Sequence, residues 1–160
     1  MIDTGKVQDR RKLRFASIDE LLADVERIVA ADRAGALRRT GNWTAGQVFG
    51  HLATWINFAY EGYPFKVPWF VKLFVRAKKQ TYLRDGMPAG VRLPRTEDGT
   101  FGTEPMTTSE GAERLRAAVA RLRSEPARFD SPAWGPMTLE EQITLALRHA
   151  ELHLGFLHPG

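Results

Sequence analysis

The sequence predicts an all-α protein, a bundle of four main helices, on three observations. Four segments begin with a helix-capping pattern that is followed by apolar residues at helical spacing. Patterns typical of strands are weak throughout the chain. Its 160 residues, 43% apolar and 26% charged, suit one globular domain with a core. We therefore expect a single helical-bundle domain over residues 1–160, with the basic segment 1–14 as a poorly ordered tail.

Each expected helix begins at a Ser or Thr that is followed three residues later by Glu or Gln. This pair satisfies backbone N–H groups that the first turn leaves free. A Gly or Pro follows where each pattern of apolar residues stops. The four expected helices cover residues 17–34, 44–60, 107–126 and 138–157.

Almost fifty residues separate the second of these helices from the third. Residues 68–79 could form a short helix with an apolar face of Trp69, Phe70, Leu73 and Phe74. Residues 84–105 are rich in Pro and Gly and predict a long ordered loop. A connection of this length suggests a crossover between parallel helices, or a functional lid.

Charge and cysteine content narrow the classes of function. The net charge of the chain is +4. Residues 66–95 contain eight Lys and Arg but only one acidic residue, Asp85. Such a patch can attract nucleic acid, acidic lipid or an anionic substrate. There is no cysteine, which excludes disulfides, thiolate nucleophiles and Cys-based metal sites and fits a reducing cytosol. No segment that is long enough to cross a bilayer is free of both charged and polar residues. We therefore expect a cytoplasmic protein without a membrane partner.

Three of the four histidines are expected to point into the bundle. His149 and His153 are four residues apart, so they lie about 40° apart on one helix face, together with apolar neighbours. His51 lies in the middle of the second helix, on a face that includes Trp55. Three buried imidazoles are hard to satisfy with side chains alone, whereas a divalent ion accepts a lone pair from each. Three protein ligands leave a coordination position open, as in catalytic sites, and would suit Zn, Ni, Co, Fe or Cu.

Other interpretations of these residues stay open. Histidines on an apolar face are often hydrogen-bonded core residues, and His158 is expected at the surface or at a fraying helix end. Gln47 could orient a metal-bound water, or brace the start of its helix. Trp55 could wall a pocket, or simply pack in the core. No carboxylate is clearly placed as a general base, although Glu61 and the long loop (Glu97, Asp98, Glu104) could reach the site.

Two motifs resemble the DinB-like (YfiT-like) superfamily, and within it a bacterial family of unknown function. They are Gly41-Asn42-Trp43-Thr44 leading to Gln47 and His51, and Ser131-Pro132-Ala133-Trp134-Gly135-Pro136-Met137-Thr138 leading to His149 and His153. The resemblance covers residues 10–157. It implies an up-down-down-up four-helix bundle, often dimeric, with a metal on His51, His149 and His153. Members with known activity are mostly thiol-dependent S-transferases. The chain departs from the pattern at Ser131, where the family carries His.

The leading hypothesis is a metal-dependent enzyme, a transferase or hydrolase, with a divalent ion (Zn, Ni or Fe) and a small-molecule substrate such as a low-molecular-weight thiol. The alternative is a non-catalytic ligand-binding or structural bundle whose metal is structural or missing. A nucleic-acid-binding module ranks third, because no binding motif accompanies the basic stretch. A homodimer is expected because the second helix is apolar nearly all round, with Phe49, Ile56 and Tyr60 opposite His51.

Overall fold

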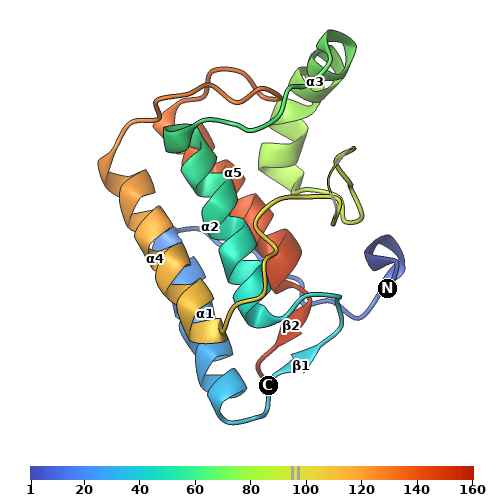
Figure 1. Ribbon diagram of the computed structural model, residues 1–160, viewed down its shortest axis with the longest axis vertical. Helices are drawn as coiled ribbons and strands as arrows, with labels where there is room; N and C mark the ends of the chain where they lie inside the picture. The colour runs from blue at the N-terminus through green and yellow to red at the C-terminus, as the bar shows by residue number, and fades with distance from the viewer. Residues whose placement is uncertain (95, 97) are drawn as a thin grey trace.

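Five α-helices and one very small sheet form the regular structure of the residues that the computed structural model describes, 1–94, 96 and 98–160 (Figure 1). The predicted all-α fold class is confirmed. None of the described helices is long and apolar enough to cross a membrane. In chain order the elements are η1 (Thr4–Lys6), α1 (Ile18–Arg33), β1 (Arg38–Arg39), α2 (Ala45–Glu61), α3 (Trp69–Asp85), α4 (Thr108–Ser124), α5 (Leu139–Leu154) and β2 (Leu157–His158).

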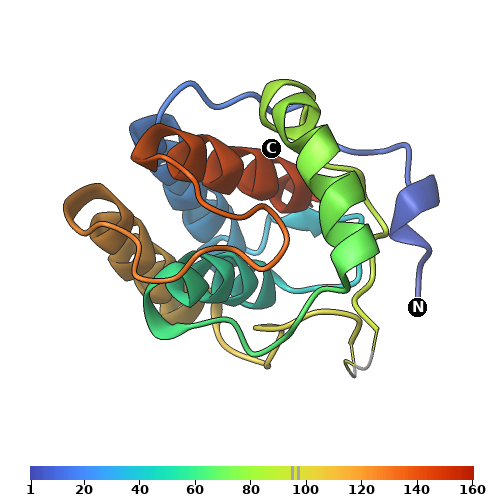
Figure 2. The same cartoon turned by 90° about the horizontal axis from the view of Figure 1, so that it is seen from above.

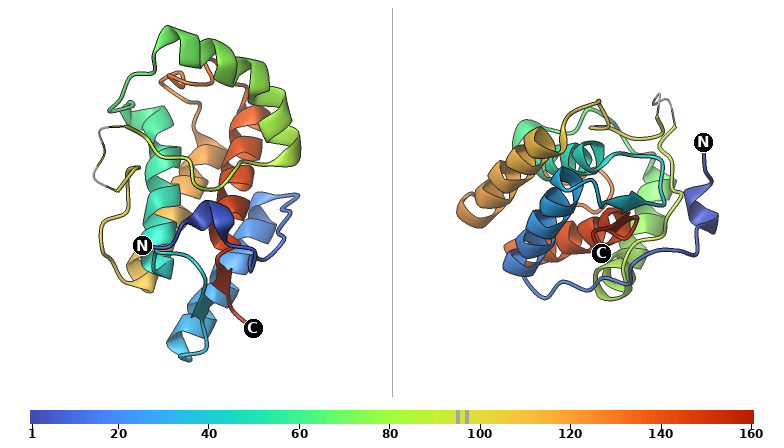
Figure 3. Two further views of the ribbon diagram at one scale, coloured as in Figure 1. Left: turned by 90° about the vertical axis from the view of Figure 1, so that its right-hand side faces the viewer. Right: turned by 90° about the horizontal axis from the view of Figure 1, so that it is seen from below.

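The four long bundle helices run up-down-down-up. In Figures 1 and 3, α1 and α5 run in one direction, while α2 and α4 run in the other. Because α2 and α4 are parallel, the chain must return along the whole bundle between them, and residues 62–107 make this crossover. The predicted topology with its long crossover is confirmed.

The capping patterns set the helix starts that the sequence predicts. The Thr44 hydroxyl accepts from the backbone N–H of Gln47, and the Gln47 side chain accepts from the backbone N–H of Thr44. The same reciprocal pair begins α4 and α5. The α2 start fixes which residues of α2 share a face, so it also fixes where His51 points.

The core lies among α1, α2, α4 and α5, and α2 packs most extensively against α4. Phe49 and Tyr60 are buried within the single chain, and the Tyr60 ring stacks against the Arg121 guanidinium of α4. The α2 face that was expected to need a partner subunit is therefore largely covered by α4. The homodimer itself stays a prediction.

The helix α3 is longer than expected and lies on the side of the bundle away from α4 (Figure 2). It contacts α5, where Lys79 pairs with Glu141 at 2.9 Å, and the turn before α5, where the Tyr82 ring meets Trp134 edge-on. The apolar face predicted for this helix, Trp69, Phe70, Leu73 and Phe74, is exposed. The helix turns Val71, Val75 and Leu83 toward the protein, which leaves the other side of its first two turns in solvent.

The helix α5 ends at Leu154, three residues before the expected end, because the chain turns at Gly155 into β2. Strand β2 pairs antiparallel with β1, and His158 lies opposite Arg38. His158 Nδ1 lies 3.1 Å from the Arg38 guanidinium. The expected fraying end is not observed, because His158 is half-buried in a small surface sheet that ties the chain end to the α1–α2 connection.

Residues 1–14 were expected to form a poorly ordered tail. In the left view of Figure 3 this segment lies in front of α2 and α5. The Arg11 guanidinium makes two hydrogen bonds to the buried Asp24 carboxylate, at 2.8 and 2.7 Å. The Arg11 backbone N–H donates to the Gly155 carbonyl at 2.8 Å. The Phe15 backbone N–H donates to the buried Glu151 carboxylate at 2.7 Å. Buried acidic groups thus hold this basic segment on the bundle.

Two glycines allow α2 and α4 to approach closely near their first turns. A Cβ on Gly111 would lie 2.5 Å from the Gly46 carbonyl oxygen, and one on Gly46 would lie 2.3 Å from the Met106 carbonyl oxygen. Both neighbours are backbone atoms, which cannot rotate away. Any side chain at these positions must therefore push the two helices apart.

Gly111→Ala should lower the free energy of unfolding by about 1–3 kcal/mol, the usual range for overpacking. The sign is informative, because Gly to Ala inside an open helix normally stabilises by up to about 1 kcal/mol. Urea unfolding followed by circular dichroism measures the change. The matched control is Ser109→Ala, an exposed position in the same turn, expected within about 0.5 kcal/mol of the unmodified chain. Stabilisation by Gly111→Ala would contradict the close crossing.

Candidate metal centre

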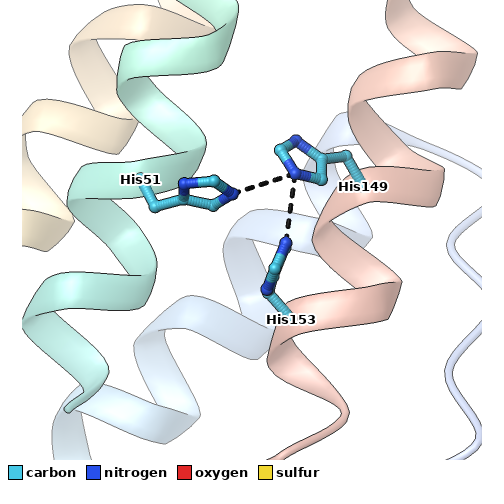
Figure 4. A group of neighbouring side chains, drawn as sticks. All are labelled: His51, His149 and His153. Atoms are coloured by element: carbon cyan, nitrogen blue, oxygen red, sulfur yellow. Dashed lines mark hydrogen bonds between the residues drawn. The ribbon is translucent and has the colours of Figure 1, made fainter. Parts of the chain in front are cut away.

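Three imidazoles from two helices converge at one point inside the bundle (Figure 4). His51 projects from α2, and His149 and His153 project from successive turns of α5. The Nε2 atom of His149 lies 3.1 Å from Nε2 of His51 and 3.1 Å from Nε2 of His153. One ligand atom from each of the three lies within 4.8 Å of the others. The structure thus brings together the three histidines that the sequence singled out.

The spacing of these nitrogens fits a shared metal ion. Imidazole nitrogens bind zinc at about 2.0–2.1 Å, so two ligands at a tetrahedral or octahedral angle lie about 2.8–3.4 Å apart. The two Nε2–Nε2 distances of 3.1 Å fall inside that range. The three side chains could therefore hold one divalent ion without rearrangement of the helices.

Hydrogen bonding alone does not satisfy this cluster. His51 Nδ1 lies 2.7 Å from the Phe101 carbonyl oxygen, which only accepts, so Nδ1 carries the proton and Nε2 carries a lone pair. His149 Nε2 faces two other Nε2 atoms and has at most one proton to donate in the neutral ring. At least one of the two Nε2–Nε2 contacts therefore has no N–H donor, or places two lone pairs against each other. A cation between the rings would remove this conflict, because it accepts the lone pairs.

Burial keeps the three rings neutral. Desolvation lowers the pKa of His51 from 6.5 to about 4, although its hydrogen bond to the Phe101 carbonyl acts in the opposite direction. Desolvation also lowers the pKa of His149 and of His153 well below 6.5, and the neighbouring imidazoles add to the shift. The Arg10 guanidinium, which donates to the Leu152 carbonyl at 3.2 Å, contributes further to the lowered pKa of His153. Neutral imidazole is the form that binds metals.

The last part of the crossover, before α4, supplies the hydrogen-bond acceptor for His51, and a glycine makes this contact possible. Gly102 has φ +78°, and a Cβ there would lie 2.5 Å from Thr54 Oγ1 and 3.1 Å from the His51 Cα atom. Only a residue without a side chain lets this backbone lie against α2. The Phe101 carbonyl and Gly102 were not identified from the sequence, because contact between this loop and α2 depends on tertiary packing; the Gly-rich composition of 98–102 was the available signal.

Aromatic rings surround the histidines. The Trp43 ring stacks on His153 with centroids 5.2 Å apart, and its centroid lies 5.0 Å from that of His51. The Trp55 ring meets His149 edge-on at 5.8 Å and His51 at 6.0 Å. Beyond Trp55 lie further aromatic rings, which form one continuous cluster: Phe58, Tyr63, Phe65 and Phe101. An apolar wall beside the metal ligands excludes water and strengthens electrostatic interactions at the centre.

The two candidate catalytic residues have different surroundings. Both ends of the Gln47 amide are engaged: its oxygen accepts from the Thr44 backbone, and its nitrogen donates to the Thr103 carbonyl at 2.9 Å. Gln47 therefore braces the α2 start and the crossover loop. The Trp55 indole N–H, by contrast, is shielded from solvent and has no acceptor among the described residues. This leaves Trp55 Nε1 as a free donor next to the histidines.

The acidic residues considered as general bases are occupied elsewhere or lie outside the described residues. Glu61 pairs with Arg121 at 3.0 Å, and Asp98 accepts from the Thr103 hydroxyl at 2.9 Å. Glu104 is exposed, and Glu97 falls outside the described part of the chain. The Glu151 carboxylate is buried but pairs with Arg148 and accepts from the Phe15 backbone. No described carboxylate is shown in contact with the three imidazoles.

Ser131, the position at which the chain departs from the resemblance described above, is buried in the turn that leads to α5. Its hydroxyl accepts from the Trp134 backbone N–H at 3.1 Å, and its carbonyl accepts from the Gly135 backbone N–H at 2.8 Å. Its side chain also contacts Tyr63, a member of the aromatic cluster. Ser131 thus shapes the connection that fixes the start of α5.

The fold and the cluster define a helical-bundle protein with a three-histidine site that could bind a metal ion. Residues 7–160 match the family described as "Protein of unknown function (DUF1569)", and the chain belongs to this family. No match was found among curated proteins or among solved structures.

The buried histidines should make the metal-free protein sensitive to mild acid. Below pH 6.5 the unfolded chain binds protons at these rings, while folded His51 resists protonation until about pH 4. Stability that is fully present above pH 6.5 is therefore lost as the pH falls. Protonation of His51 in the unfolded chain alone should lower the free energy of unfolding by about 2 kcal/mol when the pH falls from 7 to 5.

Urea unfolding with chelator present at both pH values measures this loss, and the His158→Ala variant, outside the cluster, should show the same loss. An equal free energy of unfolding at pH 7 and pH 5 would mean that the three rings are not buried in the neutral form.

Proposed function

We propose that this chain is a metal-dependent enzyme of the DinB-like superfamily, a transferase or hydrolase acting on a small molecule. The observation that supports this most strongly is the convergence of three Nε2 atoms, with that of His149 3.1 Å from each of the other two. The site offers three protein ligands, whereas structural zinc sites normally have four. The motifs around Trp43, His51 and His149 resemble that superfamily, whose characterised members are mostly thiol-dependent S-transferases.

A divalent ion held by the three Nε2 atoms would act as a Lewis acid and lower the pKa of a water or thiol at the open position. This chemistry suits a chain with no cysteine, since the nucleophile need not come from the protein. A low-molecular-weight thiol or a water molecule is the proposed co-substrate. Zn, Ni or Fe fits a ligand set of three imidazoles.

The residues around the ligands would perform three tasks. The Phe101 carbonyl holds His51 in the tautomer that presents Nε2 to the metal. Trp43, stacked on His153, restricts rotation of that ring. The free Trp55 N–H donor and the aromatic cluster beyond it would contact an apolar substrate that carries a hydrogen-bond acceptor.

The alternative is a bundle stabilised by a structural metal, and the core argues against it. Apolar side chains from α1, α2, α4 and α5 pack into one continuous core, whose contacts are between apolar groups and do not require an ion. A protein with such a core should stay folded when the metal is removed, whereas a protein that depends on a structural metal unfolds.

Metal analysis of the purified chain tests the proposed site. The unmodified chain should carry about one Zn, Ni or Fe per molecule, and the His149→Ala variant should lose it while the circular dichroism spectrum stays helical. The matched control is His158→Ala, which removes the one histidine outside the cluster and should keep the metal. No metal in the unmodified chain after reconstitution with each ion, or equal loss in both variants, would refute the metal site.

Gly102→Ala should weaken metal binding about 10–100-fold, the usual cost of losing a partner behind a ligand. The added Cβ would strike Thr54 and displace the Phe101 carbonyl from His51. The matched control is Gly86→Ala, which also has a positive φ, +103°, but open space around it, so it shares only the backbone strain. Metal competition titrations compare the two variants. Equal affinities would show that the carbonyl does not orient His51.

A further inference from the structure

The first two turns of α3 expose a set of large apolar side chains that no other described residue covers. The exposed fractions are 77% for Trp69, 61% for Phe70, 68% for Leu73 and 61% for Phe74. These four residues, here termed the α3 strip, recur at positions i, i+1, i+4 and i+5, so they occupy one side of the helix. A contiguous exposed patch of this kind marks an interaction surface.

The α3 strip lies where a flat surface could reach it. In Figures 1 and 3 the N-terminal end of α3 projects beyond the ends of α2 and α5. Only the opposite side of the helix, with Val71 and Val75, turns toward the protein. A planar partner could therefore contact the strip without meeting the bundle first.

Cations flank the strip, and acidic residues are missing from this segment. Residues 62–84 contain six Lys and Arg and no Asp or Glu. Lys79 and Arg84 pair with Glu141 and Asp85. Within the described residues the remaining four cations form no ion pair: Lys66, Lys72, Arg76 and Lys78.

The helical positions of the cations define the chemistry of the partner. Arg76 and Lys78 lie about 90–110° to either side of the strip centre. The Arg76 guanidinium lies against Gly135, whereas the long side chain of the exposed Lys78 could reach past the strip toward an anionic plane. Large apolar side chains in the middle with Lys and Arg at the edges are typical of helices that lie in the interface of an acidic bilayer.

We propose that the α3 strip docks this protein on membrane surfaces that contain anionic phospholipid. Trp69, Phe70, Leu73 and Phe74 would enter the boundary between headgroups and acyl chains, while the flanking cations neutralise lipid phosphates. A second copy of the chain fits less well, because it would bring the same four cations together. A nucleic acid also fits less well, because Leu73 cannot stack on a base and the cations do not alternate with the aromatic rings of the strip. The proposal does not depend on the metal centre.

Vesicle sedimentation of the full chain tests this proposal, with metal-loaded and chelated samples compared. The chain should sediment with vesicles of equal parts phosphatidylcholine and phosphatidylglycerol, and not with phosphatidylcholine alone. Phe70→Ser should weaken binding about tenfold, the order expected from burying one large apolar side chain. The matched control, Val91→Ser, changes another exposed apolar residue (72% exposed) outside the strip and should bind like the unmodified chain. Both variants alter exposed positions, so both should keep the helical circular dichroism spectrum.

Three results would overturn the proposal. The first is that the chain does not sediment with the anionic vesicles at low salt. The second is that Phe70→Ser binds them as tightly as the unmodified chain, which would leave only nonspecific charge attraction. The third is a concentration-dependent oligomer, or tighter binding of a single-stranded oligonucleotide, that Phe70→Ser abolishes, because the strip would then serve a second copy or a nucleic acid.

Discussion

The cluster of three imidazoles between α2 and α5 imposes the constraint on which the rest of the structure depends. His51 is buried, and His149 and His153 are half-buried. Removing their ring nitrogens from water is costly unless each nitrogen finds a partner. The Phe101 carbonyl satisfies one nitrogen of His51, while the three Nε2 atoms face each other at 3.1 Å contacts. Burial keeps all three rings neutral, as the lowered pKa values of His51, His149 and His153 show. A cluster of neutral rings with converging lone pairs could hold a metal ion, and it is a poor core.

Other parts of the fold hold these two helices in place. The Gly46–Gly111 crossing lets α4 pack closely on α2, and this leaves the His51 face of α2 free to meet α5. On the other side, buried Glu151 accepts from the Phe15 backbone and pairs with Arg148, whose Nε donates to the Leu83 carbonyl of α3 at 3.1 Å. One ion pair therefore links α5 to both the N-terminal segment and α3. This network fixes the position of α5, and with it His149 and His153.

The sequence predicted what depends on local patterns and missed what depends on contacts between distant segments. Capping pairs such as Thr44–Gln47 act within one turn, so helix starts, bundle topology and the three-histidine set could be read from the chain. The exposure of the apolar face of α3 could not be predicted, because the spacing of apolar residues is the same whether a helix face packs in a core or lies in solvent. The His158 strand pairing and the contact between Gly102 and α2 likewise arise only when segments more than 45 residues apart in the sequence meet.

X-ray absorption spectroscopy of the zinc-loaded chain tests the central claim most directly, because it reports the atoms bound to the ion. The account predicts a first shell with three imidazole nitrogens at about 2.0–2.1 Å and at least one oxygen ligand from solvent. In His51→Ala the imidazole contribution should fall. A first shell without imidazole scattering, or one that is unchanged in His51→Ala, would contradict the assignment of these three histidines as a metal centre.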